Sequence, residues 1–175
     1  MPDIYTVIAS QIEALRQQVN YIRNPSVEVP DPGNSNWPQF WFWGSGPNTG
    51  AVWDTEGWGE GWEKKRSLRL TLSNSTNFWQ QYSFPVTGGA IYRFGARFKG
   101  SGSPDVKLTM RFFDASDNFL GEVDLPLPGT FTSWTIHAGV AQAPATAAKA
   151  DIIWRATTNT TCDLKADDFF VTKVS

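Results

Sequence analysis

Carboxylates and aromatic rings are the side chains of this sequence that could carry chemistry. The 175 residues include one Cys (Cys162) and one His (His137). A zinc finger, a disulfide framework and a Cys–His catalytic pair therefore each lack the partners that they need. The chain instead has nine Trp, twelve Phe and four Tyr, with 15 Lys or Arg and 17 Asp or Glu. A site in this chain is expected to combine aromatic surfaces with carboxylates or amides.

Six of the nine Trp residues lie in one irregular stretch between Trp37 and Trp62, among Gly, Pro, Asn and Glu. Long irregular segments of this kind usually carry function. A sugar presents an apolar C–H face ringed by hydroxyl groups, so its site needs flat aromatic platforms with polar groups at their edges. An alternative is that these rings hold the loop onto the domain core. The candidates for sugar binding are Trp41, Trp43, Trp53, Trp58 and Trp62.

The same stretch contains carboxylates that could form a glycosidase site. That reaction needs two carboxylates about 5–10 Å apart, one of them with a raised pKa. Asp54, Glu56, Glu60 and Glu63 supply carboxylates, but they lie on one Gly-rich segment without a further catalytic signature. We expect a binding protein and not an enzyme.

Charge and hydropathy exclude several classes of partner. The net charge is −2 and no run of Lys or Arg is longer than three residues, which argues against nucleic acid. No apolar stretch approaches the roughly 20 residues that a membrane span needs. The N-terminal residues lack the cationic start, apolar core and cleavage site of a secretory signal. We expect no membrane partner, and export by another route if the protein leaves the cell.

The first 23 residues show the spacing of an amphipathic helix. Apolar residues alternate spacings of three and four, which places them on one seam of a heptad. A lone helix of this length is marginal in water, so the seam is expected to be buried, either on its own domain or in a short parallel oligomer. β-branched residues at both seam positions favour a trimer. The seam consists of Tyr5, Ile8, Ile12, Leu15, Val19 and Ile22.

From residue 24 onward the hydrophobic period is two. Segments 66–72, 92–98 and 106–112 alternate apolar and polar residues, and Gly- or Asp-rich turn clusters separate them. Many short strands at this spacing indicate an all-β antiparallel sandwich or barrel. The predicted core is Leu68, Leu70, Tyr92, Phe94, Phe98, Leu108, Met110, Phe112, Trp134, Ile152 and Trp154.

The polar face of the middle strands carries a second pattern. A turn near Gly102 would place Arg93 opposite Arg111 and Arg97 opposite Lys107, and like charges across a sheet are unfavourable. Pairing around the turn at 114–118 would in addition bring Glu122 beside Arg111 and Asp124 beside Thr109. Either a solvated charge ladder or a binding face for acidic partners is expected there.

Several motifs carry a family resemblance. The segment Asn24–Glu28 resembles the opening strand of carbohydrate-binding modules of families four, nine and twenty-two. The resemblance spans about 24–174, all but the predicted helix, and implies a galactose-binding-like jelly-roll β-sandwich. The predicted organisation is therefore an attachment helix over 1–23 followed by this sandwich over 24–175. It also implies non-catalytic sugar binding. The further motifs are Trp37, Ser67–Leu70, Phe78–Gln81, Val86–Phe94, Trp134, Pro144 and Asp167–Val171.

Modules that this chain resembles often hold one structural calcium ion between the first and last strands. By position, the resemblance implies Glu28 and Asp168 as calcium ligands. Calcium prefers oxygen ligands, and the two carboxylates would repel each other if they were neighbours without a cation. The alternative is that both are solvated strand residues.

Together these features suggest a non-catalytic virion accessory protein, either a head decoration or a tail appendage of a bacteriophage. It would be made in the host cytoplasm, would join the particle surface through other virion proteins such as the major capsid or tail proteins, and would display weak glycan sites multivalently. The first alternative is a capsid-stabilising decoration protein without sugar binding. The second is a detached module of a glycan-degrading system.

Overall fold

The computed structural model describes residues 20–44, 51–54, 57, 66–71, 77–156 and 162–174. These residues form β-strands and contain no helix, so the expectation of an all-β domain is confirmed. None of them forms a helix that could cross a membrane. The strands are β1 (Pro30–Asp31), β2 (Asn34–Pro38), β3 (Trp41–Gly44), β4 (Ala51–Asp54), β5 (Ser67–Thr71), β6 (Asn77–Gln81), β7 (Phe84–Pro85), β8 (Ile91–Phe113), β9 (Phe119–Gln142), β10 (Lys149–Ala156) and β11 (Asp163–Lys173).

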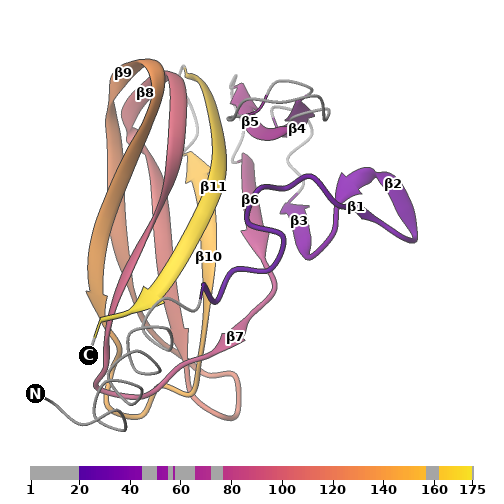
Figure 1. Ribbon diagram of the computed structural model, residues 1–175. Helices are drawn as coiled ribbons and strands as arrows, with labels where there is room; N and C mark the ends of the chain where they lie inside the picture. The colour runs from indigo at the N-terminus through magenta and orange to yellow at the C-terminus, as the bar shows by residue number, and fades with distance from the viewer. Residues whose placement is uncertain are drawn as a thin grey trace, which may run out of the picture.

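One long hairpin, β8 with β9, runs through both layers of the fold (Figure 1). The first half of β8 pairs with β11, and its second half pairs with β10. We call layer one the strands β9, β8, β11, β5 and β4, with β9 contributing residues 130–142. Layer two comprises β9, β8, β10, β6 and β3, with β9 contributing residues 119–127. All these pairings are antiparallel.

The core lies between the two layers. Phe98 and Phe169 of layer one contact Trp154 of layer two, with ring centroids 6.1 Å and 6.4 Å apart. The even-numbered residues of β8 point inward in both of its halves, from Tyr92 to Phe112, which is the pattern that period two predicts. Every predicted core residue is fully or almost fully buried except Trp134, which is only half-buried on the edge strand β9.

A glycine allows the bend that takes β8 from one layer to the other. Gly100 has φ +117°, in the region that favours glycine, and a Cβ atom there would collide with the backbone of Asp163. The β8–β9 register shifts between Phe98 and Lys107, around this bend. The Gly- and Ser-rich segment at 100–104 is therefore a bend within a strand and not the hairpin turn that the sequence suggested.

The beginning of the described chain is extended. The Tyr21 N–H donates to the Val171 carbonyl (2.9 Å). The Asn20 side chain donates to the Phe169 carbonyl (2.9 Å) and accepts the backbone N–H of Val171 (3.0 Å). Ile22 is 4% exposed and belongs to the domain core. The prediction of a helical oligomer seam is therefore wrong at Ile22. The other seam residues lie outside the described residues: Tyr5, Ile8, Ile12, Leu15 and Val19.

The polar ladder was predicted correctly in one half. Arg111 pairs with Glu122 and Thr109 pairs with Asp124, because the short turn at 114–118 fixes the register. The like-charge pairing predicted for the other half is wrong. Arg93 lies opposite Val140, because the segment near Gly102 does not reverse the chain.

Candidate functional site

Aromatic and polar side chains meet in a pocket on the outer face of layer two. Phe42 of β3 stacks on Tyr82, which follows β6, with ring centroids 5.6 Å apart and an interplanar angle of 28°. Tyr82 is 54% exposed. The pocket has a volume of about 270 Å³. It is lined by Phe42, Gln80, Gln81, Tyr82, Ser83, Phe113, Asp117 and Asp151.

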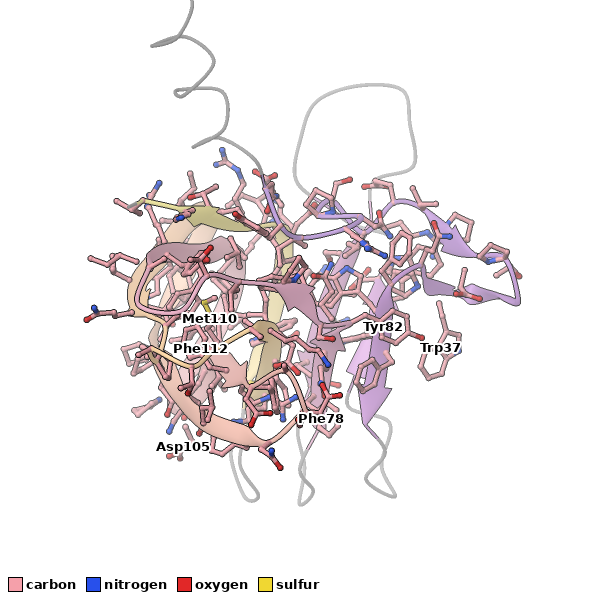
Figure 2. The ribbon with its side chains drawn as sticks, turned by 90° about the horizontal axis from the view of Figure 1, so that it is seen from below. Trp37, Phe78, Tyr82, Asp105, Met110 and Phe112 are labelled. Atoms are coloured by element: carbon pink, nitrogen blue, oxygen red, sulfur yellow. The ribbon has the colours of Figure 1, made fainter. Side chains whose placement is uncertain are left out.

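Alternation along the strands explains why these side chains share one face. Phe42 pairs with Gln80 across β3 and β6, and Asp151 pairs with Arg111 across β10 and β8. The neighbouring positions, such as Trp79 and Ile152, are buried in the core. Figure 2 shows Tyr82 on the side of β3, on the same side as Trp37, whereas Met110 and Phe112 lie in the interior. Four parts of the chain that are distant in sequence thus build one pocket.

Asp151 forms the polar floor of this pocket. The residue is 3% exposed, and its carboxylate accepts hydrogen bonds from Arg111 Nε (2.8 Å) and Nη2 (2.7 Å). Gln80 Nε2 donates to the same carboxylate (2.7 Å). Such a bidentate Arg–carboxylate contact is strong and also holds both groups in one orientation. The floor of the pocket is therefore preorganised.

Hydrogen-bonding capacity remains for a ligand. Among the described residues, Gln80 Oε1 and the Ser83 hydroxyl have no hydrogen-bond partner, and Arg111 Nη1 donates to none. Asp151 Oδ1 accepts one hydrogen bond and retains a lone pair. The pocket thus offers acceptors and donors next to an exposed aromatic ring.

The charges around the pocket balance one another. Asp151 pairs with Arg111, and Asp117 pairs with Lys149 (2.7 Å). Farther along the same face, Lys107 pairs with Asp124 at 2.7 Å. Partial burial would by itself raise the pKa of Asp124, but hydrogen bonds from Lys107 and Thr109 and the nearby positive charges lower it. This face is therefore a ladder of ion pairs, without an excess of either charge in the pocket.

Two of the Trp residues predicted to bind sugar hold the N-terminal loop onto the sandwich. Trp41 is 3% exposed, its ring lies 4.5 Å from that of Phe169, and its indole N–H donates to the Asn24 carbonyl (3.2 Å). Trp53 donates to the Val27 carbonyl (2.9 Å), and the Arg66 guanidinium covers its ring at 4.1 Å. Burial makes Trp41 a core residue in place of the predicted platform, and one face of Trp53 is covered.

The remaining three predicted Trp residues are described in part or not at all. The backbone of Trp43 belongs to β3 and pairs with Trp79. Trp58 and Trp62 lie outside the described residues. Their role in sugar binding stays a prediction.

The two carboxylates predicted to bind calcium have other contacts. Glu28 Oε1 accepts the Arg66 N–H (2.7 Å), and Asp168 accepts a hydrogen bond from Arg97 Nε at 3.1 Å. Asp168 itself has φ +51°, at a register shift of β11. No group of three Asp, Glu, His or Cys side chains in the described part of the chain is arranged to hold a metal. Calcium at Glu28 and Asp168 stays a prediction.

Sequence reasoning missed the aromatic pair at the mouth of the pocket. Phe42 alternates with Trp41 and Trp43, so a strand over 41–44 would have placed it on the face opposite to Trp41. Gln80 lies within a motif that supported the family resemblance. Asp151, in contrast, reaches the pocket only because β10 lies between β6 and β8.

Comparison with known proteins places the fold. No protein-family model and no curated protein matches the sequence. Among solved structures, the enzymatically active domain of bacteriophage CBA120 tailspike protein 4 is similar over 89% of this chain, with 15% identity and a TM-score of 0.64. This chain spans 22% of that tailspike chain.

Isolated modules are similar over nearly their whole length. The xylan-binding domain of Paenibacillus barcinonensis Xyn10C has 16% identity and a TM-score of 0.54, with 86% of this chain and 92% of that chain covered. A family 4 carbohydrate-binding module has 16% identity and a TM-score of 0.53, with 87% and 99% covered. At these identities the similarity shows the fold, a β-sandwich like that of carbohydrate-binding modules.

Proposed function

We propose that this protein binds a neutral polysaccharide in the pocket on the outer face of layer two. The observation that carries the proposal is the exposed ring of Tyr82, stacked on Phe42 beside the fixed carboxylate of Asp151. The fold shared with carbohydrate-binding modules supports it.

The pocket matches the two surfaces of a sugar ring. The apolar C–H face of a pyranose would stack on Tyr82, which Phe42 supports from behind. Sugar hydroxyl groups would donate to Asp151 Oδ1 and Gln80 Oε1 and accept from Arg111. Each carboxylate of the pocket is paired with a positively charged side chain, so the pocket has no net charge. A neutral ligand is therefore favoured over an acidic one.

The test measures binding of the full chain to soluble polysaccharides by affinity electrophoresis and calorimetry. The panel includes xylan, β-1,4-galactan and β-glucan, with polygalacturonate as the acidic counterpart. Tyr82→Ala is expected to weaken binding about tenfold or more, since it removes the stacking surface. Val174→Ala, which truncates a side chain that is 50% exposed at the end of β11, is the matched control and should bind as the unmodified chain does. Failure to bind any neutral glycan at millimolar concentration would contradict the proposal.

The Trp-rich segment supplies a competing location for the same function. Trp58→Ala and Trp62→Ala can be compared with Tyr82→Ala against the glycan that binds. Loss of binding in the Trp variants alone would move the site from the pocket to the Trp-rich segment. Loss in Tyr82→Ala alone supports the pocket.

We further propose that the role is non-catalytic. Asp117 and Asp151, the two carboxylates of the pocket, are both engaged in ion pairs, an arrangement suited to holding a ligand and not to transferring a proton. The expected result is that a bound polysaccharide keeps its length after prolonged incubation. Release of reducing ends would contradict this part of the proposal.

The finer proposal is a bacteriophage appendage or head decoration that presents several weak sites at once, as a trimer joined through the N-terminal segment. The similarity to part of a tailspike supports a phage setting. The competing role is a capsid-stabilising decoration in which outward Arg and Lys side chains grip an acidic shell. Internal pairing of Arg97, Lys107 and Arg111 with Asp side chains favours the glycan role. Binding of purified particles to the glycan, with loss on Tyr82→Ala, distinguishes the two.

A further inference from the structure

Two exposed aromatic rings flank the polar floor of the pocket, one on each side. Tyr82 is 54% exposed, and Phe119, the first residue of β9, is 57% exposed. They are the two most exposed aromatic side chains in the described part of the chain. Exposed apolar surface that gathers at one place commonly marks a ligand groove. The site therefore extends beyond the pocket, toward Phe119.

The ring of Phe119 has a less exposed ring beside it. Phe119 pairs with Phe113 across β9 and β8, and the two rings meet edge to face with their centroids 5.9 Å apart. Phe113 lines the pocket, and the Arg111 guanidinium lies 5.6 Å from the centroid of its ring. Because Arg111 also binds Asp151, one side chain connects the polar floor with this second aromatic pair.

The strand order sets the distance between the two exposed rings. Strands β10 and β8 lie between β6, which Tyr82 follows, and β9, which begins at Phe119. Three strand spacings of roughly 4.8 Å separate β6 from β9, or about 14 Å. The repeat of a linear pyranose chain is close to one such spacing. One sugar ring therefore cannot reach both aromatic surfaces, whereas a trisaccharide can.

We propose that the site binds a linear neutral polysaccharide across the strands, from Tyr82 over Asp151 to Phe119. This inference rests on the proposed function and adds the length and the direction of the bound ligand. One sugar ring stacks on Tyr82 and another on Phe119. The hydroxyl groups of the sugar between them meet Gln80, Asp151 and Arg111.

The other direction, along the strands, offers no exposed ring. Ile153 is the next outward residue of β10 after Asp151, yet it is only 4% exposed. Arg155, the outward residue after that, binds Glu122 at 2.6 Å. A chain lying along β10 would therefore meet an ion pair, whereas a chain lying across the strands meets a second aromatic surface.

Calorimetry with an oligosaccharide series tests the length of the site. The series runs from the disaccharide to the hexasaccharide of the neutral polysaccharide that the full chain binds. The affinity is expected to rise about tenfold from the disaccharide to the trisaccharide, because only the longer ligand reaches Phe119, and then to level off. Equal affinities for these two ligands would overturn the proposal.

Substitutions at Phe119 test the second aromatic surface. Phe119→Ala should weaken binding of the trisaccharide and of the polysaccharide about tenfold, and leave the affinity for the disaccharide unchanged. Phe119→Trp keeps a flat ring and should bind as the unmodified chain does, which separates stacking from a structural role. Val140→Ala, which truncates a side chain that is 61% exposed on layer one, is the matched control. A loss in Phe119→Trp equal to that in Phe119→Ala contradicts stacking.

Phe78→Ala tests the direction of the ligand. Phe78 pairs with Arg155 on the outer face of layer two, along the strands from the pocket. Its removal should leave the binding of every ligand in the series unchanged. A loss in Phe78→Ala without a loss in Phe119→Ala would turn the ligand along the strands and overturn the proposal.

The same variants distinguish this inference from the proposed function. If Tyr82→Ala loses binding and Phe119→Ala keeps it for all ligand lengths, the pocket remains a glycan site and only its extension to Phe119 is wrong. If the unmodified chain binds no neutral glycan, the proposed function and this inference are both wrong.

Discussion

At the scale of single residues, the buried charge of Asp151 is compensated by one neighbour, Arg111. Its carboxylate is 3% exposed and receives two hydrogen bonds from Arg111. Removal of one partner of a buried ion pair leaves the other charge uncompensated in a poorly solvated place. The same pair that orients the pocket is thus a condition for the stability of layer two.

Arg111→Ala is therefore expected to lower the free energy of unfolding by about 3–5 kcal/mol. Urea denaturation measures the change. The control is Lys149→Ala, which removes a pair whose Asp117 side chain is 72% exposed and should cost at most about 1 kcal/mol. Equal losses in the two variants would mean that the burial of Asp151 has no energetic consequence.

Cys162 gives a second prediction at this scale. Its thiol donates to the Leu70 carbonyl (3.4 Å), and burial raises its pKa to about 11. Because the thiolate is the reactive form, the folded protein should react slowly with a disulfide reagent at pH 8, and the urea-unfolded protein should react fast. Rapid reaction of the folded chain would show that this part of the sandwich opens readily.

At the scale of elements, the bend of β8 depends on Gly100. Gly100→Ala adds a Cβ atom that meets the Asp163 backbone at a φ of +117°. The expected loss in the free energy of unfolding is about 2 kcal/mol. Gly129→Ala is the matched control, since a Cβ atom there meets nothing within 4 Å, and its effect should stay within about 0.5 kcal/mol. Thermal and urea unfolding of both variants measure the difference.

The elements also show where prediction from sequence succeeds. Alternation located β5, β8 and β10 and nearly all of their core residues, because a strand with one buried face must alternate. The short turn at 114–118 fixed the register of Arg111 with Glu122. The hairpin turn predicted at the Gly-rich segment 100–104 was wrong, because the same residues suit a hairpin turn and a bend within a strand. Only the pairing of β8 with two different partner strands distinguishes the turn from the bend.

The site was less predictable than the fold for a related reason. Aromatic density pointed to the Trp-rich segment, but an aromatic side chain serves a core as well as it serves a ligand, as Trp41 shows. Phe42, Tyr82 and Asp151 lie on segments far apart in the sequence. Their meeting depends on the strand order β3, β6, β10, β8, which local patterns do not encode.

At the scale of the whole molecule, ion pairs connect neighbouring strands within each of the two layers. These ion pairs make the stability of the protein depend on pH. Hydrogen bonds from Arg69 lower the pKa of Asp163, which lies on β11 opposite Thr71. The pKa of Asp124 is also lowered, although burial acts in the opposite direction. An acid whose pKa is lower in the folded state contributes stability above its unfolded pKa and loses it on acidification.

Stability is therefore expected to be constant near neutral pH and to fall as the pH drops below about 4. Urea midpoints measured from pH 7 to pH 2 test this. Asp163→Asn should be less stable at pH 7 but show a shallower decline in acid, because it has no proton to take up at that position. A decline as steep as that of the unmodified chain would assign the acid sensitivity to other carboxylates.

The passage of β8 and β9 through both layers has a consequence for how the molecule opens. Because each layer contains half of the same hairpin, neither layer can detach while the other stays intact. Amide protons of β8 in the two layers should therefore exchange with solvent through one shared opening event. A glycan bound on layer two would then slow the exchange of the most protected amides on layer one, by a factor set by its concentration and affinity. Slower amide exchange in layer one would thus report that a glycan occupies the pocket on layer two.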